Sequence, residues 1–275
     1  MDSDKRFQNI VSNPASVLQH FSEETLEKDI VCLCGSLAEG FGNETSDIDV
    51  FVLLNVGEIK DVLDDDTDLI LRTDQTTMRN IVENDIRLDI EYFRRLDIED
   101  AIQFLNTFDF AAPSVGEVYY LSNDLIDTLH RLQFAHPLTN GESFFKMFQQ
   151  FPRQAFGSYI TLRLFWRYAT QFEDLQGAFS SGDFGTTFVI GRMLTDLATN
   201  MFLAFQGQTN PSAKWIRRKL EVYSKDHGRS LLEEYVRIQS IPMDERQVDQ
   251  YVHEVVNYCE RLNRRVQEYL KKLQN

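Results

Sequence analysis

Two acidic residues, Asp47 and Asp49, stand two positions apart at the start of an apolar segment, residues 50–54. Side chains at this spacing in a β-strand point to the same face. Two carboxylates held side by side repel one another unless a cation lies between them. Hard oxygen ligands of this kind suit Mg²⁺, which also binds the phosphate oxygens of nucleotides. The pair therefore indicates a magnesium site that serves a phosphorylated substrate.

A later segment supplies a further carboxylate. Residues 78–82 and 86–93 flank an Asn-Asp pair and are predicted to form a β-hairpin. In the second arm Asp89 and Glu91 share one face, opposite to the apolar side chains that alternate with them. Three carboxylates on adjacent strands could hold two metal ions, the arrangement used for in-line displacement at phosphorus.

A Gly-Ser pair precedes the aspartates. Residues 29–34 form a short apolar run that predicts a buried strand ending at Gly35. Glycine lets the backbone approach a ligand closely, and the N–H groups at the start of the following helical turn can hold phosphate oxygens. We therefore expect Gly35 and Ser36 to bind a nucleotide.

The Gly-Ser pair, the ten-residue gap and the Asp-x-Asp pattern resemble the signature of the nucleotidyltransferase superfamily of DNA polymerase β. The fuller string, Gly35-Ser36-x-Ala38-x-Gly40 followed by Ser46-Asp47-Ile48-Asp49, is similar to the small-molecule branch, which includes the aminoglycoside and lincosamide nucleotidyltransferases. The resemblance implies that Asp47, Asp49 and a third carboxylate are catalytic metal ligands and that Ser46 belongs to the nucleotide site. Of the two candidates for the third ligand, Glu91 is favoured over Asp89, because an Asp-x-Glu-Tyr strand after a hairpin is associated with this branch.

The resemblance is strong over residues 31–93 and weaker over the rest of the chain. Residues 210–215 resemble a Lys-Trp turn of related bacterial nucleotidyltransferases, which implies that Lys214 contacts the triphosphate. In relatives of the aminoglycoside type a carboxylate from the helical part can act as general base, for which Asp183 and Asp196 are candidates.

Each assignment has an ordinary alternative. Lys214 could be a surface lysine, and Asp89 and Glu91 could belong to a solvated strand face paired with Arg79 and Arg87. Arg192 and Asp196, four residues apart in an apolar helix, could form an internal ion pair or line a cleft.

The elements that position these residues fall into two parts. An amphipathic helix over residues 15–27 and the predicted strands come first. After about residue 113 the hydrophobic period changes from 2 to 3.6 residues. The predicted helical stripes lie within residues 125–132, 159–169, 189–201 and 248–270. The predicted fold is α+β, with a short mixed-sheet nucleotidyltransferase domain over residues 1–115 followed by an all-helical substrate-binding domain over residues 116–275.

Composition limits the partners. The net charge is −15, and residues 1–115 carry 25 acidic against 9 basic side chains. Such a field repels phosphate backbones and argues against nucleic acid, whereas it attracts cations. The three cysteines fit a reducing cytosol. No apolar run is expected to reach the roughly 20 residues that cross a bilayer, and the first residues do not have the pattern of a signal peptide. A cytoplasmic protein with no membrane partner is expected.

Together these features predict a nucleotidyltransferase that uses two Mg²⁺ ions. It would transfer AMP from ATP, or another NMP from its NTP, to a hydroxyl of a small molecule bound between the two domains, with release of pyrophosphate. A cationic acceptor is expected first, with a neutral or lincosamide-like acceptor as the alternative. Antibiotic resistance is the first specific role expected, and a biosynthetic enzyme of the same chemistry is the second. The alternatives are a protein or RNA acceptor, as in toxin–antitoxin or stress-signalling enzymes, and a non-catalytic regulatory module with a relic site. The sequence leaves the oligomeric state open.

Overall fold

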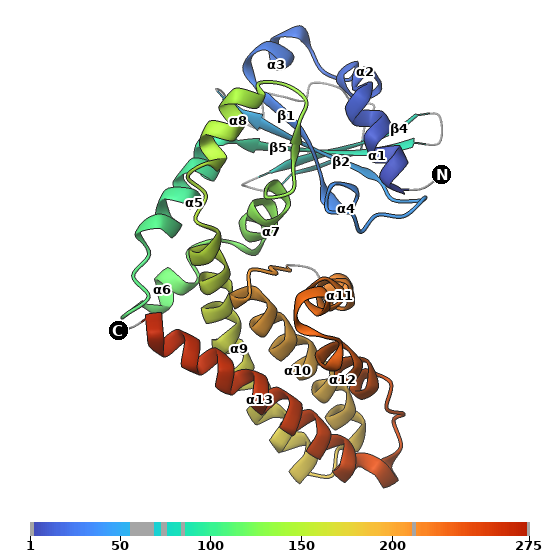
Figure 1. Ribbon diagram of the computed structural model, residues 1–275, viewed down its shortest axis with the longest axis vertical. Coiled ribbons are helices and arrows are strands. Elements are labelled where there is room, and N and C mark those ends of the chain that lie inside the picture. Colours follow the sequence, from blue (N-terminus) through green and yellow to red (C-terminus); the bar gives the residue numbers. More distant parts are fainter. Residues whose placement is uncertain (1–2, 56–68, 73–75, 84–85, 211–212, 274–275) are drawn as a thin grey trace. The chain divides into compact units, whose positions relative to one another are not determined.

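The structure, a computed structural model, describes residues 3–55, 69–72, 76–83, 86–210 and 213–273. The chain folds into two compact units (Figure 1). The first contains residues 1–104 and 123–151, and the second contains residues 105–122 and 152–275. This division differs from a single boundary at residue 115, because residues 123–151 return to the sheet of the first unit. Their return is marked by a short strand, β6 (His136–Pro137), which pairs with the first strand of the sheet.

Within its described residues, the first unit is built on a six-stranded sheet in the order β3-β4-β5-β2-β1-β6. Strands β2 and β5 are parallel, and the other neighbouring pairs are antiparallel. The five longer strands are β1 (Ile30–Cys34), β2 (Ile48–Leu54), β3 (Leu69–Arg72), β4 (Thr77–Glu83) and β5 (Ile86–Arg94). The fold class predicted from the sequence is confirmed, and so is the β4–β5 hairpin. Its predicted turn, Asn84-Asp85, lies outside the described residues.

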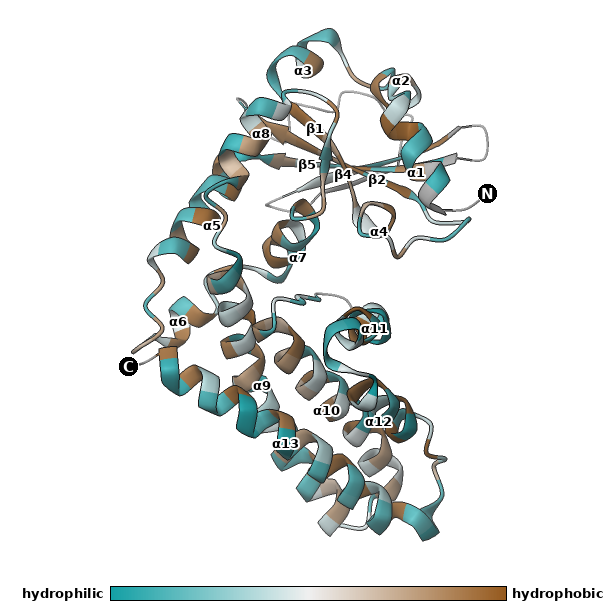
Figure 2. Ribbon diagram, viewed as in Figure 1, coloured by the Kyte–Doolittle hydropathy of each residue, from teal (hydrophilic) through white to brown (hydrophobic). Residues whose placement is uncertain are grey.

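Short helices cover one face of the sheet. Alternate strand residues such as Val31, Val50 and Ile90 form a core with apolar side chains of α1 (Ser3–Ser12) and α2 (Ala15–Leu18). The predicted helix over residues 15–27 is broken into α2 and α3 (Glu23–Lys28), because the Ser22 side chain caps α3 by accepting a hydrogen bond from the Thr25 N–H. The apolar stripes of β1 and β2 are visible in Figure 2. The opposite face carries the remaining alternate residues, including Asp49 and Glu91.

Three further helices belong wholly or partly to the first unit. Helix α7 (Asn123–Leu132) lies on the acidic face of the sheet, where Arg131 contacts the ring of Phe51. Helix α8 (Gly141–Phe148) follows β6. Helix α5 (Arg95–Thr107) continues from β5, and the division between the units falls within it, after Phe104.

The second unit is helical. Its elements are α6 (Val115–Val118), α9 (Arg153–Ser180), α10 (Phe184–Phe205), η2 (Ala213–Trp215), α11 (Ile216–His227), α12 (Ser230–Gln239), η3 (Glu245–Gln247) and α13 (Val248–Leu273). Buried side chains of α10, such as Phe188, Leu194 and Met201, join those of α11, α12 and α13 in one core. The predicted helical stripes are all confirmed as helices.

Helix α10 is more apolar than expected from the sequence. Its 22 residues are long and apolar enough to cross a membrane, with a mean hydropathy of 1.3 over an 18-residue window. In this structure 61% of that window is buried inside the protein. A mostly buried core helix meets the same criteria of length and composition, so this helix does not by itself indicate a membrane span.

Candidate active site

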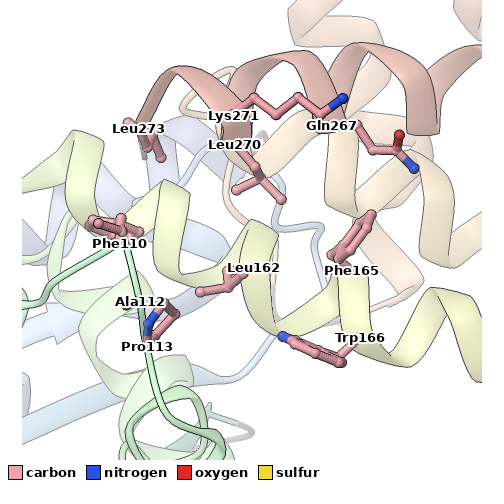
Figure 3. Close-up of a pocket in the computed structure, with 11 residues that line it drawn as sticks. Phe110, Ala112, Pro113, Leu162, Phe165, Trp166, Gln267, Leu270, Lys271 and Leu273 are labelled. Carbon is pink, nitrogen blue, oxygen red and sulfur yellow. The ribbon is translucent and has the colours of Figure 1, made fainter. Parts of the chain in front are cut away.

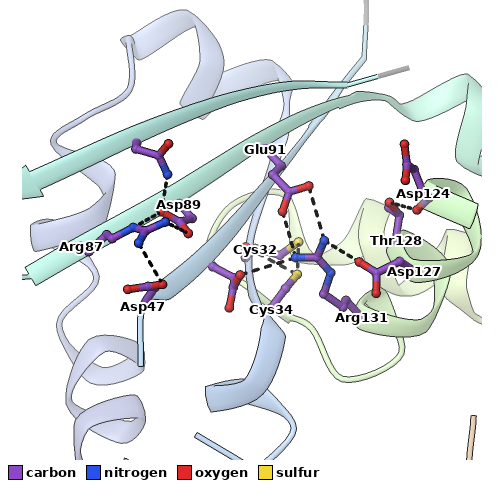
Figure 4. A network of polar contacts seen from close by, with 12 residues as sticks. Cys32, Cys34, Asp47, Arg87, Asp89, Glu91, Asp124, Asp127, Thr128 and Arg131 are labelled. Atoms are coloured by element: carbon purple, nitrogen blue, oxygen red, sulfur yellow. Dashed lines mark hydrogen bonds and ion pairs between the residues drawn. The ribbon is translucent and has the colours of Figure 1, made fainter. Parts of the chain in front are cut away.

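Asp47, Asp89 and Glu91 lie close to the two parallel strands β2 and β5 (Figure 4), and Asp49 belongs to β2 itself. In the register of β2 and β5, Asp49 is the partner of Asp89, and Phe51 is the partner of Glu91. Because Asp47 precedes Asp49 by two residues and Glu91 follows Asp89 by two, all four positions share this face. The family resemblance favours Glu91 over Asp89 as the third ligand. In the structure Asp89 is directly beside Asp49, whereas Glu91 is one strand repeat further along β5.

Two arginines link these carboxylates in pairs. Arg87 donates to both carboxylate oxygens of Asp89, at 2.9 and 3.0 Å, and its Nη1 lies 3.7 Å from Asp47. The side-chain amide of Asn80 also donates to Asp89. The ion pair of Arg87 with Asp89, considered from the sequence, is therefore present. Arg79 is the register partner of Ile90 and belongs to the other face.

Arg131 of α7 forms the second link, and sequence reasoning missed it. Its Nη1 lies 2.9 Å from Glu91 Oε1 and 3.5 Å from Asp49 Oδ1, while its Nη2 lies 2.6 Å from Asp127. The guanidinium carbon is 4.6 Å from the centre of the Phe51 ring, a cation–π contact. The only local signal was the spacing of Asp127 and Arg131, four residues apart on a predicted helix.

Burial and like charge change the acidity of the site. The pKa of Asp49 is raised to about 6, mainly by burial; the carboxylates of Glu91, Asp89 and Asp47 add to the rise and Arg131 opposes it. Burial also raises the pKa of Glu91, which Arg131 opposes. For Arg131 burial by itself would lower the pKa, but Glu91, Asp127 and Asp49 outweigh it and raise the pKa above the ordinary value. The site therefore holds more negative charge than its arginines compensate.

Gly35 is required by the position of Asp49. Its φ is +71°, and a Cβ atom built on it would lie 1.9 Å from Asp49 Oδ2. The close approach predicted for this glycine is thus made by a carboxylate of the site. Gly35 and Ser36 begin α4 (Gly35–Ala38), a single helical turn. Ser46, in the loop that leads to β2, accepts a hydrogen bond from the N–H of Asn43 at 2.9 Å.

Lys214 and the two candidate bases belong to the second unit. The Nζ atom of Lys214 lies 5.1 Å from the centre of the Trp215 ring, in η2. Part of the predicted Lys-Trp turn, residues 211–212, lies outside the described residues. Asp183 is the N-cap of α10, where it accepts a hydrogen bond from the N–H of Thr186 at 3.1 Å.

Asp196 is held by α12. Its Oδ1 accepts hydrogen bonds from the Tyr235 hydroxyl at 2.8 Å and from the Gln239 amide at 2.6 Å. Arg192, considered from the sequence as its ion-pair partner, donates instead to the carbonyl oxygen of Ile241 at 2.9 Å. Both Asp183 and Asp196 therefore have structural partners that account for their presence.

The helical unit contains an apolar cavity of about 420 Å³ (Figure 3). It lies between the segment before α6 and the helices α9 and α13. The lining residues are Phe110, Ala111, Ala112, Pro113, Leu162, Phe165, Trp166, Gln267, Leu270, Lys271 and Leu273. Its walls could hold the apolar part of a ligand, but none of the residues predicted for the site lines it.

Carboxylates are suitable ligands for a divalent metal ion, but their side chains are not arranged around a common metal position in this structure. Within the part of the chain that the structure describes, no group of three or more His, Cys, Asp or Glu side chains could hold a metal ion. The guanidinium of Arg131 lies instead between Asp49 and Glu91, as a stand-in cation. Clustered carboxylate oxygens around a positive charge form the donor set of a hard cation such as Mg²⁺, so the residues present fit this group.

Comparison with known proteins finds a match in the segment that contains these carboxylates. Residues 16–105 match the family model of the nucleotidyltransferase domain, and this range contains all four carboxylates as well as Gly35, Ser36 and Ser46. No curated protein sequence matches the chain. Among solved structures, a nucleotidyltransferase-like protein from Exiguobacterium sibiricum 255-15 has a TM-score of 0.48 and 10% sequence identity, and the match covers 92% of this chain and 74% of that chain. Residues 16–105 thus resemble a nucleotidyltransferase domain, and this match supports a transferase enzyme.

Proposed function

We propose that this enzyme transfers a nucleoside monophosphate from an NTP, with ATP as the first candidate, to a hydroxyl group of a small molecule and releases pyrophosphate. The observation that carries the proposal is the pair Asp49 and Asp89 on adjacent parallel strands, with Asp47 directly before β2, inside the matched domain. With a change of side-chain orientation, two neighbouring carboxylates and a third on the next strand would supply oxygen ligands for the divalent ions that in-line displacement at phosphorus uses.

The metal assignment follows from the same face. Asp47 and Asp49 would hold Mg²⁺ together with Asp89 or Glu91, and the strand register favours Asp89 because it lies beside Asp49. When bound, Mg²⁺ supplies charge stabilisation for the phosphates and lowers the pKa of the acceptor hydroxyl. Gly35 leaves room for the Asp49 carboxylate. Ser36 and Ser46 are proposed to orient phosphate oxygens, and Lys214 to contribute a point charge to the triphosphate.

The acceptor is proposed to be small and cationic. The excess of acidic over basic side chains in residues 1–115 creates a field that attracts amines and repels polyanions. An amine-rich antibiotic is the first candidate and a metabolite of the same chemistry is the second. The three cysteines are all buried and free, which is consistent with a reducing cytosolic location.

The proposal is tested by a screen of pyrophosphate release. The four NTPs are combined with amine-rich antibiotics, hydroxylated metabolites, tRNA and a protein mixture, with Mg²⁺ or with EDTA. Turnover is expected with one NTP and a small cationic acceptor, only in Mg²⁺, and is expected to be absent from Asp49→Asn. Turnover with tRNA or protein alone would move the acceptor to the macromolecular class. No release with any acceptor, by a folded protein, would contradict the proposed enzyme.

A further inference from the structure

The guanidinium of Arg131 contacts Asp49, a carboxylate that a bound metal ion would also contact. Its Nη1 is 3.5 Å from Asp49 Oδ1 and 2.9 Å from Glu91 Oε1. Asp49 is also one of the two carboxylates that the proposed function assigns to Mg²⁺. Two cations close to one carboxylate repel each other, and this repulsion is strong where little water screens it. Occupation of Asp49 by a metal ion and contact of Asp49 with Arg131 therefore oppose one another.

The surroundings of Arg131 make this opposition strong. Only 21% of the Arg131 side chain is exposed, and 7% of Glu91. Arg87, which links Asp47 with Asp89 in a similar way, has 51% of its side chain exposed. Water screens the charge of Arg87, so its contacts contribute little energy. Arg131 is therefore the arginine whose charge the metal ion would experience most strongly.

Asp127 gives Arg131 a partner that does not depend on Asp49. It lies one helical turn earlier on α7 and binds Nη2 at 2.6 Å, whereas the contact with Asp49 is made by Nη1. A guanidinium that gives up its contact with Asp49 can keep this ion pair. The Nε atom of Arg131 is buried and has no hydrogen-bond partner among the described residues, so it does not hold the group in its present place.

We propose that Arg131 is a counter-cation built into the site, which competes with the divalent metal ion for Asp49, and that Asp127 retains it when the metal binds. In the metal-free protein Arg131 neutralises Asp49 and Glu91, which otherwise repel each other. When a metal ion takes Asp49, the guanidinium withdraws toward Asp127. This inference rests on the metal site of the proposed function and adds a residue that sets its affinity.

The test measures Mn²⁺ binding to the nucleotide-free full chain, followed by the electron paramagnetic resonance signal of free Mn²⁺. Arg131→Gln is expected to bind Mn²⁺ about tenfold more tightly than the wild type, because a nearby positive charge is lost. Asp127→Asn is expected to bind it several-fold more weakly, because Arg131 then has no partner except Glu91 and Asp49. Arg95→Gln is the matched control. It removes one positive charge from the same unit, where Arg95 pairs with Glu99 at 2.8 Å, and its affinity is expected to equal that of the wild type.

Melting temperatures provide a second measurement. Mn²⁺ is expected to raise the melting temperature of Arg131→Gln by more degrees than that of the wild type, because in the metal-free variant Asp49 and Glu91 face each other without a counter-cation. If Arg131→Gln does not fold, Asp127→Asn and Arg131→Lys carry the test. The lysine variant is expected to bind Mn²⁺ more tightly than the wild type, because one ammonium cannot bridge both carboxylates as the guanidinium does.

The outcomes separate this inference from the proposed function. Equal or weaker Mn²⁺ binding by the folded Arg131 variants, or unchanged binding by Asp127→Asn, overturns the competition. When the competition is overturned in this way, the metal site of the proposed function still stands if the wild type binds Mn²⁺ and Asp49→Asn does not. Absence of Mn²⁺ binding by every variant and the wild type overturns both.

Discussion

Asp49 of β2 and Asp89 of β5 are register partners on neighbouring parallel strands, and both side chains belong to the face that carries Arg131. The sheet therefore brings together two carboxylates that lie 40 positions apart in the chain. A single-residue slip of β5 against β2 would exchange Asp89 for an apolar neighbour, because side chains alternate between the two faces. The hydrophobic core on the other face, with Leu88 and Ile90, opposes such a slip.

The aspartate pair of β2 should be essential for turnover. Asp47→Asn and Asp49→Asn are each expected to lower pyrophosphate release at least a hundredfold, because a metal ligand contributes several kcal/mol of charge stabilisation. The measurement is release with an identified acceptor in Mg²⁺. Asp97→Asn, which breaks an ion pair with Arg94 elsewhere in the unit, is the control and should retain wild-type turnover. Activity within a few-fold of the wild type in either site variant would refute the mechanism.

The register reverses the expected order of the two carboxylates of β5. From the sequence Glu91 is favoured as the third ligand, but Asp89 is the residue beside Asp49. Asp89→Asn is therefore expected to lose about as much activity as Asp49→Asn, whereas Glu91→Gln should lose less activity and more stability, because it leaves Arg131 without a buried partner. Steady-state kinetics and thermal melting of both variants check this. A larger loss of activity in Glu91→Gln would return the assignment to Glu91.

Gly35→Ala should damage the site as well as the backbone. An alanine at φ +71° costs roughly 1–2 kcal/mol in any context, and here its Cβ would also displace the Asp49 carboxylate. Gly228→Ala is the matched control, since Gly228 has φ +79° and nothing within 4 Å of the added Cβ. Both variants should melt at lower temperature, and only Gly35→Ala should lose turnover. Equal turnover in the two variants would exclude the steric explanation.

The raised pKa of Asp49 predicts a pH-dependent difference in stability. In the folded protein this carboxyl holds its proton to about pH 6, whereas in the unfolded chain it loses it near 3.8. Ionisation of Asp49 therefore lowers the free energy of unfolding as the pH rises from about 4 to about 6. Above that range the free energy of unfolding stays lower by the same amount. At 1.36 kcal/mol per pKa unit the cost is about 3 kcal/mol.

Asp49→Asn removes this cost. In EDTA at pH 8 the variant is expected to be more stable than the wild type by about 3 kcal/mol, with the difference shrinking toward zero near pH 4. Urea denaturation at a series of pH values measures it. A constant difference across this range, or a less stable variant at pH 8, would show that the Asp49 carboxyl is not destabilised in the folded protein.

The sequence by itself determined strands β1, β2, β4 and β5, the helical stripes and the acidic character of one strand face, whereas β3 and β6 were not predicted. Period-2 alternation in residues 86–93 and the apolar runs before Gly35 and after Asp49 are local patterns, and local periodicity is sufficient to predict such elements. The motif from Gly35 to Asp49 lies within 15 residues, so its resemblance to the nucleotidyltransferase signature could be recognised without the fold.

Only the tertiary structure decided which residues meet across these elements. The register of β2 against β5 depends on packing of the opposite face, and it placed Asp89 rather than Glu91 beside Asp49. Arg131 is 82 residues from Asp49 and reaches it because residues 123–151 return to the sheet. Nothing in the local pattern of α7 predicts that return, since the charge of a helical arginine is equally compatible with solvent. Long-range pairing of this kind is determined by burial of apolar surface in the whole unit, which no short segment contains.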